Sequence, residues 1–265
     1  MHNELSSEFS GKLVKMKCKN CGNGVSDNFC SKCGQNTKVG RIDHKHIFRE
    51  IPDSIFQLNR GLLFTIKELF LGPGTGIKGY LGGKRQGYVK PITYVLLLST
   101  IYGIASTFID QKTLLGNLIK GISTAHAAKF NTKFDFAMLD WFANNHAYTT
   151  VLLVPVFAIS SYLIFLEFKL NYFEHIVINA YLTGQQALIY VFFILLQSII
   201  SVDNYYFPLI PLAFSFMFAL WTFFQLFGKN KSFKITVLTI LTYSLYAVFI
   251  LGCIAVMIVA SIWNK

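Results

Sequence analysis

The sequence predicts an all-α integral membrane bundle of about five transmembrane helices, preceded by a small polar module near the N-terminus. Hydrophobic residues make up 53% of the 265 residues and charged residues only 14%, whereas soluble domains carry about 25% charged residues. Four cysteines fall within residues 18–33. All apolar stretches long enough to cross a bilayer lie after residue 88, so the chain divides into a polar and an apolar part.

Positive charge is concentrated in the first third of the chain. Residues 1–90 hold 15 Lys/Arg and 7 Asp/Glu, which supplies most of the net charge of +11. Membrane proteins keep basic residues on the cytoplasmic side, and this explanation is favoured over nucleic-acid binding, which needs a basic patch on a recognised fold. The first 40 residues contain no apolar run typical of a signal peptide. We therefore expect residues 1–16 to be a flexible, untranslocated N-terminus.

The four cysteines predict a zinc ribbon at residues 17–38. Cys18, Cys21, Cys30 and Cys33 form the pattern C-x2-C-x8-C-x2-C. Two such pairs supply the four thiolates of a tetrahedral Zn²⁺ site, which leaves no position for a reactive water and makes the zinc structural. A disulfide pair or a redox dithiol is the alternative, but each needs an oxidising compartment or a βαβ context.

A glycine follows the second cysteine of each pair, at Gly22 and Gly34. Glycine lets the backbone turn so that its amides face the sulfurs. These CxxCG pairs resemble the zinc-ribbon modules found at the ends of many bacterial membrane and regulatory proteins. The resemblance covers residues 17–37 and implies a docking or stabilising role.

Residues 39–88 are predicted to form amphipathic interfacial helices followed by a basic, Gly-rich turn. Between Asp43 and Leu71, apolar residues recur at helical spacing with charged residues between them. The apolar positions are Ile51, Ile55, Leu58, Leu62 and Leu69, together with Phe48, Phe56, Phe64 and Phe70. The stretch is too charged to span a bilayer, so we expect it to lie in the interface plane. A soluble helix packed on the ribbon is the alternative.

The Gly-rich stretch that follows formally matches G-x-G-x-x-G at residues 74–79. The dinucleotide fingerprint requires a preceding strand within a βαβ unit, which is missing here, so a turn toward the membrane is the favoured interpretation. Four basic residues then crowd before the first span: Lys78, Lys84, Arg85 and Lys90. We expect them to bind anionic lipid head groups or a partner and to hold this edge inside.

The chain resembles a bacterial family of zinc-ribbon membrane proteins, domain of unknown function 3667. The resemblance rests on CKNCG and CSKCGQ, and on Thr65, Glu68, Leu69, Pro73, Gly74, Ile77, Tyr80, Leu81, Gly83, Lys84, Arg85, Tyr88 and Pro91, with weaker support from Asn171, Tyr172, Glu174 and His175. It implies a multi-pass protein of the bacterial cytoplasmic (inner) membrane, and it implies no particular activity.

Five apolar stretches within residues 89–265 are long enough to cross about 30 Å of hydrocarbon. They lie at about residues 89–109, 147–168, 176–200, 205–227 and 235–263. Lys and Arg near the span ends favour an N-terminus inside and a C-terminus outside. The substantial extracytoplasmic loop is then the one at about residues 110–146, in which FDFAMLDWF is predicted to form an amphipathic interfacial helix.

Polar residues recur along one face of the third span. They are His175, Asn179, Thr183, Gln186, Tyr190 and Gln197, with Glu174 at the start. Such a stripe is costly against lipid, so it should face other helices or a wet groove. Interhelical hydrogen bonding is the favoured interpretation, and a polar pathway is the alternative.

The leading functional hypothesis is a non-enzymatic membrane scaffold, assembly factor or regulator. Its ribbon and basic segment would dock a cytoplasmic or membrane protein partner or an anionic lipid surface. The alternative is a small transporter or lipid-handling protein that uses the polar stripe, although inverted repeats are not visible. A membrane enzyme would need Glu167, Glu174 and His175 to form an accessible cluster, and no catalytic constellation is recognisable in the sequence.

Overall fold

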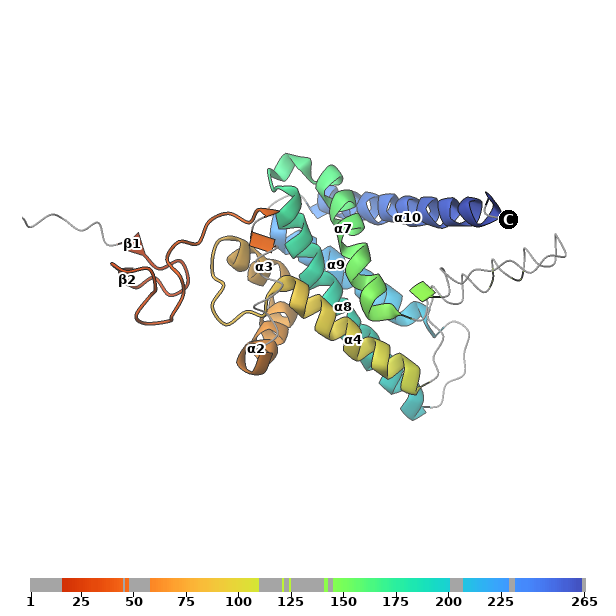
Figure 1. Cartoon of the computed structure of the whole chain (residues 1–265), viewed down its shortest axis with the longest axis horizontal. Helices are drawn as coiled ribbons and strands as arrows, with labels where there is room; N and C mark the ends of the chain where they lie inside the picture. The colour runs from red at the N-terminus through yellow and green to blue at the C-terminus, as the bar shows by residue number, and fades with distance from the viewer. Residues whose placement is uncertain are drawn as a thin grey trace, which may run out of the picture. The chain divides into compact units, whose positions relative to one another are not determined.

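The computed structural model describes most of the polar module and of the apolar region (Figure 1). The described residues are 16–44, 46–47, 58–109, 121, 124, 141–142, 145–200, 207–228 and 232–263. The chain forms two compact units, which we call the ribbon unit (Met1–Arg41 with Gly79–Gln86) and the helical unit (Ile42–Lys78 with Gly87–Lys265). The predicted N-terminal tail before residue 16, the first part of the amphipathic segment at 48–57, and nearly all of the 110–146 loop lie outside the described residues.

The ribbon unit is built from short antiparallel pairings. Strand β1 (Met16–Lys17) pairs with β2 (Gly24–Val25), so that Met16 lies opposite Val25. A single bridge joins Phe29 and Asn36. The hydrophobic cluster at the cysteine turns consists of Cys18, Val25 and Cys30, with Cys21 and Cys33 packed against them. Because four of these five side chains are thiols, the unit has little apolar core of its own. Modules of this kind need a disulfide or a bound metal ion to be stable.

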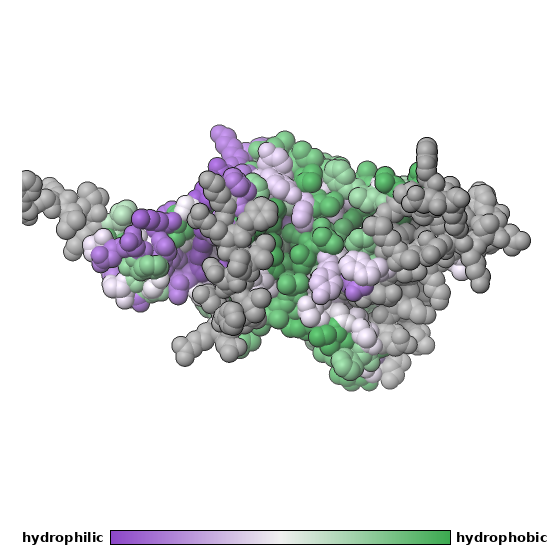
Figure 2. Space-filling model, viewed as in Figure 1, coloured by the Kyte–Doolittle hydropathy of each residue, from purple (hydrophilic) through white to green (hydrophobic). Residues whose placement is uncertain are grey.

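The described residues of the helical unit include five helices that are long and apolar enough to cross a membrane. They are α4 (Pro91–Phe108), α7 (His146–Ile164), α8 (Tyr172–Ile200), α9 (Leu209–Phe227) and α10 (Ser232–Trp263). Large apolar side chains such as Phe192, Met217 and Val248 are more than half exposed on them, as a lipid-facing surface requires. Figure 2 shows this hydrophobic surface over the helices. The predicted bundle and the multi-pass membrane character are therefore confirmed.

Helix α8 is the central element of the bundle. It packs most extensively on α4 and α7 and also contacts α9, while α10 packs on α7 and α9. Every residue from Glu174 to Leu182 is buried. The closest approach is at Gly184, where an added Cβ would lie 2.6 Å from Cδ1 of Tyr94 on α4. Glycine at this position therefore allows the Tyr94 ring to pack against the α8 backbone, beside the Tyr181 ring 5.5 Å away.

Helix α2 (Leu58–Leu71) corresponds to the second part of the predicted amphipathic segment. One face is buried within the helical unit at Thr65 and Leu69, and the side-chain amide of Gln185 on α8 donates to the Ile66 carbonyl at 2.9 Å. Leu63 and Leu71 are 78% and 70% exposed. The helix thus docks on α8 and keeps apolar side chains on its outside, where lipid can cover them.

The Gly-rich stretch, for which the sequence predicts a turn, is mostly helical. The chain breaks only at Gly72, and α3 (Pro73–Leu81) begins at once. Pro73 suits the first helical position because its missing N–H would have no partner there. The N–H groups of Gly74 and Thr75 donate to Oε1 of Gln225 on α9, at 2.9 and 3.3 Å. A Cβ on Gly74 would lie 2.6 Å from the Thr222 carbonyl oxygen, so close packing against α9 explains this glycine.

We expect Gly184→Ala to destabilise the bundle by about 1–3 kcal/mol, because the new methyl group must displace the Tyr94 ring from a packed position. The matched control is Gly252→Ala on α10, where an added Cβ meets nothing within 4 Å. Both substitutions gain the same helix propensity of about 1 kcal/mol. Thermal unfolding of the detergent-purified chain checks the difference. Equal unfolding temperatures for the two variants would contradict the α4–α8 packing.

Candidate functional site

The two cysteine pairs form equivalent turns that repeat after 12 residues. In the first turn the N–H of Cys18 donates to the Asn23 carbonyl at 2.8 Å, and the N–H of Gly22 donates to the Cys18 carbonyl at 2.9 Å. In the second turn Cys30 donates to Gln35 at 2.9 Å and Gly34 to Cys30 at 2.8 Å. Gly22 and Gly34 adopt φ values of 74° and 72°, which favour glycine. The predicted role of both glycines agrees with this geometry.

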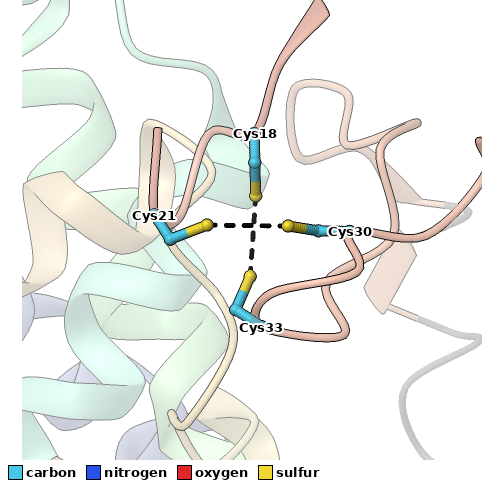
Figure 3. Close-up of side chains that lie close together, drawn as sticks. All are labelled: Cys18, Cys21, Cys30 and Cys33. Atoms are coloured by element: carbon cyan, nitrogen blue, oxygen red, sulfur yellow. Dashed lines mark hydrogen bonds between the residues drawn. The ribbon is translucent and has the colours of Figure 1, made fainter. Parts of the chain in front are cut away.

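The four cysteine sulfurs point toward a common centre (Figure 3). The Sγ atoms of Cys18 and Cys33 lie 3.6 Å apart, as do those of Cys21 and Cys30. All four lie within 4.8 Å of one another. A tetrahedral ion with sulfur ligands at about 2.3 Å separates its sulfurs by about 3.8 Å. The four thiols therefore fit a metal ion, and within the described residues they are the group of His, Cys, Asp or Glu side chains that could hold one.

The backbone prepares the first cysteine of each pair to act as a thiolate. A backbone hydrogen bond from Cys21 lowers the pKa of the Cys18 thiol, and one from Cys33 lowers the pKa of Cys30 to about 6. A backbone hydrogen bond from Asn23 also acts to lower the pKa of Cys21, but burial and the three neighbouring sulfurs outweigh it and raise that pKa to about 11. Four thiols this close cannot all ionise without a cation, which a metal ion supplies.

The four basic residues predicted to bind lipid or a partner are divided between the two units. Lys84 and Arg85 belong to the ribbon unit, and Lys78 and Lys90 to the helical unit. Lys78 is exposed in the last turn of α3, where a cation is favourable. Lys84 is also exposed. Arg85 is half-buried and donates from its guanidinium to the Gly40 carbonyl at 2.9 Å, so part of its donor capacity serves the fold.

The polar stripe of the third span begins at the buried end of α8. His175 and Asn179 are fully buried. Nδ1 of His175 lies 3.0 Å from the Ser161 hydroxyl of α7, and the Asn179 amide donates to the same hydroxyl at 2.7 Å. This Ser161–His175–Asn179 cluster joins α7 to α8. Nε2 of His175 and Oδ1 of Asn179 have no hydrogen-bond partner among the described residues.

The remaining residues of the stripe are half-buried. The Gln186 amide donates to the Ser215 carbonyl of α9 at 3.1 Å and lies 3.0 Å from the Tyr243 hydroxyl of α10. Tyr190 packs its ring 5.7 Å from that of Tyr102. Thr183 and Gln197 are half-buried. These contacts agree with interhelical hydrogen bonding, the favoured interpretation of the stripe.

The predicted acid/base candidates make structural contacts. Glu174 accepts the Asn171 N–H at 2.8 Å, while the Asn171 side chain accepts the Glu174 N–H at 2.9 Å, so the two cap the start of α8. Glu167, in the short 3-10 helix Leu166–Phe168, forms an ion pair with Lys234 at the start of α10.

The long-range hydrogen bonds of several residues carry no signal in the sequence. Gln35, Ser161, Asn171, Tyr181 and Gln185 are of types that usually lie on surfaces or pack among apolar residues. Each instead bonds to a segment that is distant in sequence, for example Tyr181, whose hydroxyl donates to the Val89 carbonyl at 2.7 Å. The 12-residue repeat of the cysteine pairs makes Gln35 equivalent to Asn23, and Gln35 and Asn171 fall in stretches that carry the family resemblance. None of these observations identifies the partner of either side chain.

We expect Ser161→Ala to lower the stability of the bundle by about 1–3 kcal/mol, because it leaves the buried His175 and Asn179 side chains without their shared partner. The control is Ser160→Ala, since among the described residues the buried Ser160 hydroxyl bonds only the Val156 carbonyl of its own helix, at 3.2 Å. Thermal unfolding in detergent gives the comparison. If the two alanine variants unfold alike, the cluster does not hold α7 to α8.

Comparison with known proteins supports the family resemblance over part of the chain. No curated protein and no solved structure matches this chain. A family described as "Protein of unknown function (DUF3667)" matches residues 59–103. The matched region includes nearly all of α2, all of α3, the loop that carries Lys84 and Arg85, and most of α4, whereas the cysteines lie outside it. The match confirms, over residues 59–103, the resemblance that the stretch from Pro73 to Arg85 predicted.

Proposed function

We propose that this chain is a non-enzymatic integral membrane scaffold, assembly factor or regulator. Its ribbon unit docks an anionic surface of a protein partner or of the membrane. The carrying observation is the cluster of four cysteine thiols, which would give a bound metal ion four protein ligands and leave no position for a substrate or a reactive water. The structural contacts of Glu167 and Glu174 support the same view, because they occupy the carboxylates that could have served acid/base chemistry.

Zinc is the proposed metal. Thiolate ligands are soft and favour Zn²⁺ or Cu(I) and iron over Mg²⁺ or Ca²⁺, and a closed tetrahedral four-sulfur site is typical of structural zinc. The small ribbon unit, whose core consists mostly of its own thiols, depends on such an ion for folding. The zinc therefore stabilises a surface and does not take part in a reaction.

The surface that this zinc would stabilise is strongly basic. Within the described parts of the ribbon unit the only carboxylate is Asp27. The cations are Lys17, Lys19, Lys32, Lys38, Arg41, Lys84 and Arg85. Four thiolates around one divalent ion contribute about −2, so the unit stays positive. Figure 2 shows hydrophilic residues over this unit. An anionic partner surface or anionic lipid head groups are the complementary ligands.

We further propose that the N-terminus lies in the cytoplasm and that the membrane is the cytoplasmic membrane of a bacterium. The basic residues of positions 78–90, Lys169, and the lysines at positions 229, 231 and 234 then all lie inside, as the positive-inside rule favours. Reducing conditions on that side keep the four thiols available for metal.

We expect the purified wild-type chain to carry about one zinc ion per molecule, because four thiolates make one closed site. Cys18→Ser removes a ligand and should abolish this stoichiometric zinc. The matched control is Cys253→Ser, since that cysteine is exposed on α10 and outside the cluster. Metal analysis by mass spectrometry checks both variants. Zinc lost equally from both variants would contradict the assignment of the ligands.

The docking proposal is tested by cross-linking intact membranes and identifying the proteins and lipids that co-purify with the chain. Wild type and Cys253→Ser should recover the same set, whereas Cys18→Ser and Lys84→Glu should each lose at least one anionic component, because they remove the fold and the charge of the docking surface. A set that is identical in all four preparations would refute docking through the ribbon unit.

A further inference from the structure

The two equivalent cysteine turns of the ribbon unit end with different residues, Asn23 in the first turn and Gln35 in the second. Asn23 and Gln35 occupy the same position, and the backbone carbonyl of each accepts the N–H of the first cysteine of its pair. Within the described part of the chain, the Asn23 amide donates only to the neighbouring Gly24 carbonyl, at 3.3 Å. The Gln35 side chain is 4% exposed and forms hydrogen bonds with the segment that follows α3, which is distant in sequence. The two turns therefore share the same backbone hydrogen bonds, but the side chains of Asn23 and Gln35 bind different segments of the chain.

Gln35 binds the backbone of residues 82–86, which we call the basic loop. Its Nε2 donates to the Gly83 carbonyl at 2.9 Å. Its Oε1 accepts the N–H of Arg85 at 3.0 Å and of Gln86 at 3.1 Å. One side chain thus supplies three hydrogen bonds to a loop without regular secondary structure. A buried amide that satisfies three backbone groups fixes the loop more tightly than its own turns can.

Further contacts hold the basic loop against the segment that follows the second turn. Arg85 donates to the Gly40 carbonyl, and its guanidinium lies over the Tyr80 ring at 5.5 Å. Lys19, from the first turn, donates to the Val39 carbonyl at 2.7 Å. Gly83 has a φ of 109°, and a Cβ there would lie 2.7 Å from Cδ of Lys19. Apart from the local contact between Arg85 and Tyr80, these contacts all involve residues 19–40 of the ribbon unit.

We infer that Gln35 is the positioning residue through which the metal centre controls the basic loop. The metal fixes the second cysteine turn, the turn fixes the backbone of Gln35, and the Gln35 amide fixes residues 83–86. Loss of the metal unfolds a unit that has almost no other core, so it also frees the loop that carries Lys84 and Arg85. The basic surface is then presented in one geometry only while metal is bound. This inference rests on the zinc-stabilised ribbon of the proposed function.

Hydrogen–deuterium exchange of the full-length protein in lipid nanodiscs tests the inference, with zinc content measured on the same samples. In zinc-loaded wild type the amides of Arg85 and Gln86 should be protected. Gln35→Ala should raise their exchange about tenfold or more, because their buried acceptor is lost, while zinc remains at the wild-type level. Treatment of wild type with a zinc chelator should raise the same exchange by at least as much.

Two further variants separate positioning from general damage. Asn23→Ala changes the equivalent residue of the first turn and should leave both zinc content and loop exchange at wild-type values. Gln35→Glu keeps an acceptor for Arg85 and Gln86 but sets a carboxylate oxygen against the Gly83 carbonyl, so it should protect these two amides more than Gln35→Ala does and less than wild type does. Lost zinc in Gln35→Ala would assign Gln35 to ribbon folding and overturn its separate positioning role.

The outcomes distinguish this inference from the zinc proposal. Unchanged loop exchange after zinc has been removed would overturn metal control of the loop, even if zinc binds as proposed. Unchanged exchange in Gln35→Ala would overturn the role of Gln35. A wild-type chain that takes up no zinc would refute the zinc proposal and metal control together, while the Gln35→Ala comparison would still decide whether Gln35 holds the loop.

Discussion

The need to satisfy backbone polar groups at the ends of helices, where apolar surroundings keep water away, governs much of this structure. The segment before the first span shows how it is met. The Thr65 hydroxyl accepts the N–H of Val89 at 2.9 Å, and the Tyr181 hydroxyl donates to the Val89 carbonyl. Both backbone groups of Val89, which lies outside any helix, are thereby hydrogen-bonded by side chains of α2 and α8. At the start of α3, Gln225 plays the corresponding part for Gly74 and Thr75. Side chains from the bundle thus complete the hydrogen bonding of the elements that lead into it.

This constraint explains why α2 and the part of α3 up to Lys78 belong to the helical unit although neither helix is a span. Gln185 and Tyr181 are on adjacent turns of α8, and both bind backbone that precedes α4. The polar side chains of α8 therefore serve two purposes. Those at the buried end join α8 to α7 and to the preceding segments, and Gln186 joins it to α9 and α10. In a lipid bilayer the hydrophobic effect does not drive helices together, because the lipid tails are as apolar as the helix surfaces. Hydrogen bonds between helices therefore add specificity to their packing.

The sequence was sufficient for features that follow from composition and local spacing. Five apolar stretches predicted five spans because helix length and bilayer thickness set the requirement, and the cysteine spacing predicted the four-thiol cluster because two residues bring paired sulfurs around one turn. Contacts between segments that are distant in the chain could not be predicted from the sequence. The glycines at positions 74 and 76 suggested a turn, yet α3 is helical there, because Gln225 caps it and α9 approaches too closely for a side chain at Gly74. The Ser161 hydroxyl likewise pairs with His175 only in the folded bundle.

A closed metal centre can influence a protein only through the shape it holds, since it offers no open coordination position. In the ribbon unit that shape extends beyond the cysteine turns, because the Gln35 backbone belongs to the second turn and its side chain belongs to the basic loop. The Gly83 carbonyl accepts a hydrogen bond from the Gln35 side chain, and the Arg85 N–H donates one to it. Gly83 and Arg85 lie within the family-matched stretch at residues 59–103, whereas the four cysteines lie outside it. The family-matched loop therefore takes its conformation from side chains outside the match. A function assigned to that loop has to include the cysteine turns that position it.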